Sequence, residues 1–237
     1  METGKTTRYF KYAIGEIILV VIGILIALQI NNWNVNRMNT KEENTMLLAL
    51  KKEISENQLL LKNEVERHTK AFNLLSELTS YISPQPKEIN DVKLDSLIFA
   101  VGWLPRYSPN EGVINSLISS GKISLIKNDG LSSKISSWNS LLDEYNTTYK
   151  WTERDVFELL AYIKDKYPFR RTLKNFDIET VRNSEFKFSK EDLLSDLGFE
   201  SLLANRIIDA QDVLNSSEKM YSFQKEILEL IEKELEN

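Results

Sequence analysis

The sequence predicts an all-α fold with one N-terminal transmembrane helix followed by an antiparallel bundle of long amphipathic helices. Two observations lead to this prediction. Residues 12–30 form a nearly unbroken apolar run of 19 residues, interrupted only by Glu16 and Gln29. At ~1.5 Å per residue the run reaches roughly 28 Å, close to the ~30 Å hydrocarbon thickness of a bilayer. In the rest of the chain, apolar residues recur at helical spacing, and no convincing strand alternation is present.

The anchor is predicted at residues 12–33, after an N-terminal tail at residues 1–11. Tyr9, Phe10 and Tyr12 lie at one edge of the apolar run and Trp33 lies at the other. Aromatic rings of this kind favour the headgroup layer, so both edges support a membrane span. The absence of a small-residue cleavage site, together with the interruption at Glu16, favours an uncleaved signal anchor over a cleaved signal peptide.

A junction at residues 34–40 leads to a soluble bundle domain at residues 41–237. Thr40 and Glu43 have the spacing of a capping box, so a new helix could begin there. The alternative is one helix that continues from the membrane into the domain. In either case helical spacing of apolar residues extends from Leu47 to Ile82, until Pro84 stops it.

The middle of the chain predicts two short helices. Residues 91–101 have a short apolar helical pattern. The stretch from Ser108 to Glu111 then matches a helix start, with serine as the cap and Pro109 at the first helical position. We therefore interpret Glu111 as a capping residue rather than a catalytic acid, and Gly121 as the left-handed end of this helix.

The clearest helix of the domain begins after a cap at Asn128 or Asp129 and ends before Pro168. Its stripe is unusually aromatic. It could be packed core or a pocket whose tyrosine hydroxyls face a ligand, and we favour the core because any bundle helix shows such a stripe. The stripe consists of Ile135, Trp138, Leu142, Tyr145, Tyr149, Thr152, Val156, Leu159 and Ile163.

A long polar connection with at most one short extended piece is expected at residues 169–187. Ser189 opens a further helix that Gly198 could break. The last run has coiled-coil-like spacing, widened by Val213, Met220 and Ile227 to a bundle face. The spaced positions are Ile207, Ala210, Leu214, Ser217, Tyr221, Gln224, Leu228, Ile231 and Leu235.

Composition narrows the possible functions. The chain has 237 residues, a net charge of −5 and no cysteine. Residues 1–40 carry four basic and two acidic side chains, so the domain is acidic, which argues against nucleic-acid binding. The lack of cysteine excludes disulfides and thiolate metal sites, and no catalytic or phosphate-binding motif is present. We therefore expect no enzyme activity, no cofactor and no metal.

One face of the anchor is small or polar. At ~100° per residue, Glu16, Val20, Gly23 and Ala27 share this face, and small residues four apart let another helix approach closely. We expect a homo-oligomer interface in the lipid. An acid within a span can alternatively snorkel to the headgroups, pack in protonated form, or couple protons with a multi-span membrane partner.

His68 is the only histidine and falls on the apolar stripe of the first long helix. A single imidazole without cysteine is a poor metal site, so a packed histidine facing the bundle is favoured. It could still titrate near neutral pH and remains a possible functional residue together with Glu16.

Two segments resemble a known family. Residues 11–34 (KYAIGEIILVVIGILIALQINNWN) closely resemble the N-terminal signature of an uncharacterised family of small single-span envelope proteins from Gram-negative bacteria. Residues 120–128 (SGKISLIKN) are similar to its middle motif, and the chain departs from the pattern at residues 34–39. The resemblance implies location and architecture without chemistry, and it favours a helix that runs straight from the span into the domain.

The orientation follows from flanking cations. Lys5, Arg8 and Lys11 precede the span, and Arg37 and Lys41 follow it. Cations favour the cytoplasmic side, so the N-terminus is expected in the cytoplasm and the domain outside. With the resemblance, this places the chain in the inner membrane with a periplasmic domain. The favoured function is an interaction or scaffold module; the alternatives are a subunit of an energised complex that uses Glu16, or an extracytoplasmic sensory bundle.

Overall fold

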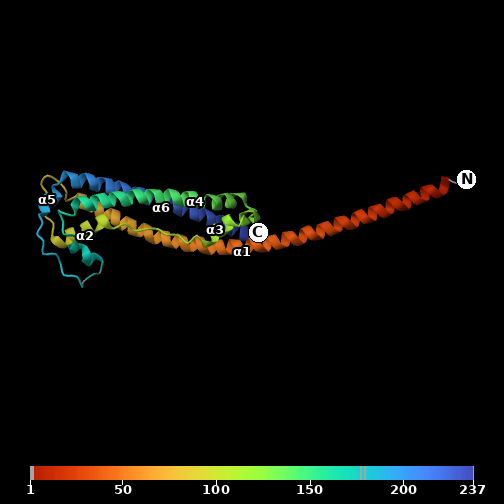
Figure 1. The fold of residues 1–237 in the computed structure, drawn as a ribbon, viewed down its shortest axis with the longest axis horizontal. Helices are drawn as coiled ribbons and strands as arrows, with labels where there is room; N and C mark the ends of the chain where they lie inside the picture. Colours follow the sequence, from red (N-terminus) through yellow and green to blue (C-terminus); the bar gives the residue numbers. More distant parts are fainter. Residues whose placement is uncertain (1–2, 177, 179, 237) are drawn as a thin grey trace.

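The first helix is continuous from the anchor into the bundle. In the computed structural model, which describes residues 3–176, 178 and 180–236, helix α1 (Thr3–Thr79) is unbroken for 77 residues. Figure 1 shows its first half extending far beyond the other elements. Residues 34–40 are helical, so the continuous helix is correct and no new helix begins at Thr40. Tyr9, Phe10 and Tyr12 lie outside the residues whose side chains are described.

Four chain segments form the bundle, and the all-helical prediction is confirmed. Helix α1 runs outward, α2 and α3 return together, α4 runs outward and α6 returns, so that the C-terminus lies beside α1 where the anchor half leaves the bundle (Figure 1). Helix α6 packs against both α1 and α4, and the described residues contain no strand. The elements after α1 are α2 (Asp91–Gly102), α3 (Gly112–Ser119), the 3-10 helix η1 (Lys122–Leu125), α4 (Asp129–Ile163), the 3-10 helix η2 (Phe169–Phe176), α5 (Lys190–Leu194) and α6 (Leu197–Leu235).

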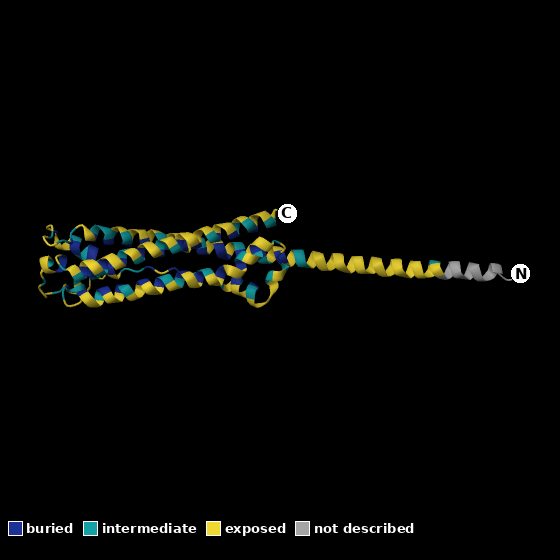
Figure 2. Ribbon diagram, turned by 90° about the horizontal axis from the view of Figure 1, so that it is seen from above, coloured by how far each residue is buried: buried dark blue, intermediate teal, exposed yellow. Residues whose placement is uncertain are grey.

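Two hydrophobic cores follow each other along the bundle. The proximal core, nearer the anchor, includes Leu50 and Trp138, and the distal core includes Leu75 and Leu159. Figure 2 shows buried residues along the bundle and exposed ones along the anchor half. Between the cores, polar side chains are buried, among them His68. The bundle is therefore stabilised by burial of apolar area at two places, separated by a polar layer.

Several local predictions are confirmed. Helix α4 begins after Asn128, whose side chain accepts a hydrogen bond from the Leu131 N–H, and all nine residues of its predicted stripe are buried. Gly121 has a φ of 72°, the left-handed conformation that glycine adopts without steric cost. Ser189 caps α5.

Three predictions need correction. Helix α3 begins at Gly112, and Glu111 makes no side-chain capping bond, so Ser108 and Pro109 lie in extended backbone before the helix. The connection at residues 169–187 contains the 3-10 helix η2, which the sequence pattern did not indicate. The final helix begins at Leu197, so Gly198 lies in its first turn and breaks nothing.

The buried stripe of α6 is rotated relative to the predicted one. Leu214 and Leu228 are half-buried and Tyr221 is exposed. Arg206, in contrast, is 1% exposed although it is charged. Val213, Met220 and Ile227, which were predicted to widen the stripe, lie at its centre, and Arg206 joins them on the buried side.

Candidate functional site

The anchor half of α1 is bare. Residues 16–38 are all exposed, and the most apolar 18-residue window of α1 has a mean hydropathy of 2.3 with none of it buried. A Cβ added at Gly23 would meet nothing within 4 Å. Glu16, Val20 and Ala27 are likewise exposed, so none of the described residues covers this face. The interface at this face stays a prediction.

The return segment between α2 and α3 is an extended strap, residues 103–111. It occupies the position that a fourth helix would fill in a regular bundle. An extended chain cannot pair its own backbone groups as a helix does, and an unpaired buried polar group costs about 1–3 kcal/mol. The long helices must therefore supply hydrogen-bonding side chains to the strap.

Side chains from three helices hydrogen-bond the first half of the strap. Arg206 of α6 donates through Nη2 to the Trp103 carbonyl at 3.2 Å, and the Tyr149 hydroxyl of α4 donates to the Leu104 carbonyl at 3.2 Å. On α1, the His68 imidazole hydrogen-bonds the Pro105 backbone. The tyrosine stripe of α4 thus uses Tyr149 for packing and for holding the strap, as the core interpretation requires.

The second half of the strap is held mainly by α1. Asn57 makes a paired contact with Asn110, donating through Nδ2 to its carbonyl and accepting from its N–H through Oδ1, both at 2.7 Å. Glu53 accepts from the N–H groups of Val113 and Ile114 at 2.7 and 3.0 Å. Helix α3 is thus capped by a side chain that lies 60 residues earlier in the chain.

Two further contacts complete the strap. The Gln224 side chain of α6 donates to the Tyr107 hydroxyl at 2.8 Å. The Trp138 indole N–H of α4 donates to Glu111 at 3.2 Å, and Glu111 occupies the N-cap position of α3 without a side-chain capping bond. Sequence reasoning missed this set. Its signal is present, because Glu53, Asn57 and Gln224 occupy core positions of otherwise apolar stripes.

The polar layer has unusual electrostatics at His68. Burial, and then the positive charges of Arg206 and Arg67, lower the pKa of His68 to about 4. His68 is therefore neutral at neutral pH, and the expectation that it titrates there is wrong. Its Nε2 atom has no hydrogen-bond partner in the described structure, so only one of the two ring nitrogens is hydrogen-bonded.

A carboxyl pair lies beside Arg206. Burial and the nearby Asp155 raise the pKa of Asp209 to about 6, against the opposing effect of Arg206. Burial lowers the pKa of Arg206 to about 10, partly offset by Asp209 and Tyr149. These groups bring side chains of α4 and α6 together beside the strap.

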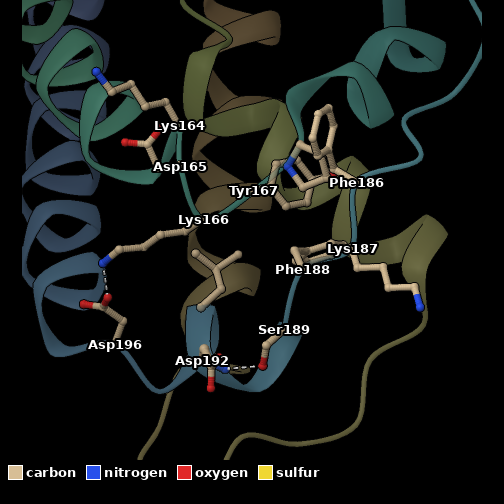
Figure 3. Close-up of a pocket in the computed structure, with 12 residues that line it drawn as sticks. Lys164, Asp165, Lys166, Tyr167, Phe186, Lys187, Phe188, Ser189, Asp192 and Asp196 are labelled. Atoms are coloured by element: carbon tan, nitrogen blue, oxygen red, sulfur yellow. Dashed lines mark hydrogen bonds and ion pairs between the residues drawn. The ribbon is translucent and has the colours of Figure 1, made fainter.

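A shallow pocket of about 640 Å³ opens at the distal end (Figure 3). It lies between the end of α4, residues 186–189 and the starts of α5 and α6. An ion pair joins Lys166 to Asp196 there. Burial acts to raise the pKa of Asp196, but Lys166, the Phe199 N–H and Tyr162 outweigh it and lower this pKa to about 2. Its lining holds three lysines and three aspartates, so it favours neither anions nor cations.

The fold and these contacts define a class: an all-helical bundle, clamped around an extended strap and carried on an apolar helix long enough to cross a membrane. A model of a family of unknown function (DUF6090) matches residues 16–165, and the chain belongs to this family. The match extends from Glu16 of α1 past the end of α4 and omits α6, which completes both cores. Neither a curated protein nor a solved structure matches the chain.

Proposed function

We propose that this protein is a membrane-anchored interaction module that associates with itself through its span and presents a helical bundle to a partner, without catalysis of its own. One observation carries the proposal: α1 has a bare apolar half and a packed half within one unbroken helix. Burying apolar surface is worth about 25 cal/mol per Å², so the bare half is stable in lipid and costly in water.

The use of the polar side chains supports a binding role. Glu53, Asn57 and Tyr149, which a catalytic site could have recruited, are all engaged with backbone groups in and beside the strap. Among the described residues, no group of three or more His, Asp or Glu side chains is arranged to hold a metal ion. The buried polar groups thus stabilise one conformation of the bundle, as an interaction module requires.

Self-association is tested by enlarging the small face. We expect Gly23→Ile to weaken dimers in crosslinking or a membrane two-hybrid assay, because the added side chain keeps the helices apart. Gly15→Ile is the matched control, since Gly15 also has open space and lies about 80° away from Gly23 around the helix. Equal association of both variants and the wild type would remove the interface from the proposal.

A second role is suggested by Glu16, the one carboxyl in the anchor. Within a span an acid is costly, and proton coupling to a multi-span membrane partner would give it a use. Glu16→Gln decides between the two roles. Unchanged folding, assembly and phenotype favour the interaction module. Loss of a phenotype that depends on the proton gradient, with assembly intact, favours the coupled complex.

For location, we propose the inner membrane, with the N-terminus in the cytoplasm and the bundle in the periplasm. The support is the excess of cations before the span. Leu197→Cys places the only thiol at the distal end, on a side chain that is 74% exposed in the wild type. A membrane-impermeant maleimide should label it in right-side-out vesicles. Labelling only after permeabilisation would reverse the orientation.

A further inference from the structure

The polar layer separates the two hydrophobic cores on all three long helices. The proximal and distal cores are distinct clusters of packed side chains, and the buried residues between them belong to neither cluster. Apart from one valine, these residues are small, polar or both aromatic and polar. The layer consists of His68 and Ala71 on α1, Tyr149, Thr152 and Val156 on α4, and Arg206 on α6.

The hydrogen bonding of the polar layer is incomplete. Among the described residues, most of the buried side-chain polar atoms that lack a hydrogen-bond partner belong to this layer or lie within one helical turn of it. Each such atom costs about 1–3 kcal/mol, so the layer stabilises the bundle less than either core does. The atoms are Glu64 Oε2, His68 Nε2, the Tyr145 hydroxyl oxygen, Arg206 Nε and Nη1, and Asp209 Oδ2.

The hydrogen bonds to the strap also differ on the two sides of this level. Beside the layer, Arg206 and Tyr149 each donate to a strap carbonyl at 3.2 Å. Towards the proximal core, both bonds between Asn57 and Asn110 are 2.7 Å long, and Glu53 caps α3 with bonds of 2.7 and 3.0 Å. Shorter bonds, and bonds to a carboxylate, are the stronger ones, so the strap is held more firmly on the proximal side.

The distal core depends on short elements. Helix α2 has 12 residues and α5 has five, and residues 80–90 lie in turns and irregular backbone. Helices of this length are marginal in isolation, so they are stable only while packed on the distal core. The proximal core, in contrast, includes the part of α1 that continues into the anchor. Its own short helix, α3, has two N–H groups satisfied by Glu53.

We propose that the distal half of the bundle opens as one unit while the proximal half stays folded, with the polar layer as the boundary between them. Proteins open in cooperative units of this kind when their parts differ in stability. Opening releases α2, η2 and α5 from the long helices. It also unwinds α1, α4 and α6 from their distal ends, which are Thr79, Ile163 and Leu197, as far as the layer. The protein then has a stable half beside the anchor and a half that opens reversibly at the far end.

Native-state hydrogen exchange of the full wild-type chain in detergent, followed by mass spectrometry, locates the boundary. We expect a step within α4, which is one unbroken helix. After correction for intrinsic rates, amides from Trp138 to Tyr145 should exchange about tenfold or more slowly than amides from Val156 to Ile163. Fraying of the helix end would instead give a gradual rise towards Ile163. A gradual rise, or equal protection in the two halves, would overturn the proposal.

Two matched variants test whether the halves open separately. Ile54 lies in the proximal core and Ile163 in the distal core, and both are 0% exposed. Valine at either position removes one buried methyl group, a change that folded cores tolerate. Ile54→Val should speed exchange several-fold in the proximal half and leave the distal half unchanged, because distal opening does not disturb Ile54.

Ile163→Val should speed exchange in both halves, since complete unfolding of the bundle includes opening of its distal half. In a bundle that unfolds only as a whole, each variant would speed exchange equally in the two halves. That result would contradict the proposal. Neither experiment depends on self-association or on orientation in the membrane, so failure here would leave the proposed function untouched.

Discussion

The two halves of helix α1 place their residues in opposite ways. In the anchor half, residues 16–38 are apolar for the most part and all exposed. In the bundle half, Glu43, Glu53, Asn57 and His68 are buried, whereas Leu48 and Leu59 are exposed. Polarity alone therefore does not decide which side of this helix faces inward. Hydrogen-bonding partners decide it for the buried polar residues, and lipid is the environment that we propose for the exposed apolar residues of the anchor half.

The comparison also shows how the helix is used. Glu43 accepts from the Lys127 N–H at 2.8 Å and pairs with the Lys127 ammonium, close to where the bundle begins. From there outward, α1 contributes both apolar packing and hydrogen bonds. Just before that point, Thr40 accepts from the Lys127 ammonium at 3.1 Å and Glu42 pairs with Lys122 at 2.7 Å, and residues 16–38 are exposed. A substitution in the bundle half should therefore impair folding, whereas a substitution in the anchor half should impair retention in the membrane.

The largest effect in the bundle half is expected from Glu53→Ala. It leaves the N–H groups of Val113 and Ile114 without a partner, and unfolding free energy should fall by about 2–4 kcal/mol. Urea unfolding of the full chain in detergent, followed by tryptophan fluorescence, measures the change. Glu56→Ala is the control, because that side chain is 54% exposed and its loss should cost at most about 0.5 kcal/mol. Equal losses would show that Glu53 does not cap α3.

A smaller effect is expected from pH. The pKa of His68 is about 4 in the folded chain and 6.5 in its ordinary state, so the unfolded chain binds the proton more readily. Stability from neutral His68 is then complete above pH 6.5 and is lost as pH falls towards 4. Asp209 acts in the opposite sense, because its folded pKa of about 6 lies above its ordinary 3.8. Folded Asp209 takes up a proton first, so acidification from 6 to 3.8 stabilises the fold.

These two groups should partly cancel between pH 4 and 6. His68→Gln should flatten the loss of stability on acidification, and Asp209→Asn should make it steeper, each by roughly 1–3 kcal/mol across the range. Unfolding midpoints in urea from pH 4 to 8 measure both. If the two variants change the pH dependence in the same direction, the assignment of opposite signs is wrong.

Local signals in the sequence predicted much of the bundle half. The stripe of α4, the cap at Asn128 and the turn at Gly121 depend on residues a few positions apart, so the sequence pattern contains them. The start of α3 does not. Ser108 and Pro109 match a cap, but Glu53 supplies the hydrogen bonds from another helix and the chain remains extended until Gly112. No local pattern carries that information.

The polar set of the candidate site was missed for a related reason. Gln224 is on the predicted stripe of α6 and Arg206 is not, yet both are buried and both donate to the strap. The most apolar face of α6 is centred nearer Leu214 and Leu228, which are half-buried in the structure. In the anchor half, by contrast, Glu16, Gly23 and Ala27 could be assigned to one face at once, since helical spacing alone defines it.

The most direct test of the central claim is extraction of membranes with alkaline carbonate. We expect the full chain to stay in the pellet, because the apolar half of α1 is solvated by lipid. A variant carrying both Val21→Arg and Leu25→Arg is the control and should lose retention, since each charge in a span costs about 2.5–3.5 kcal/mol. Wild-type chain released intact into the supernatant would contradict the membrane anchor and the functions proposed from it.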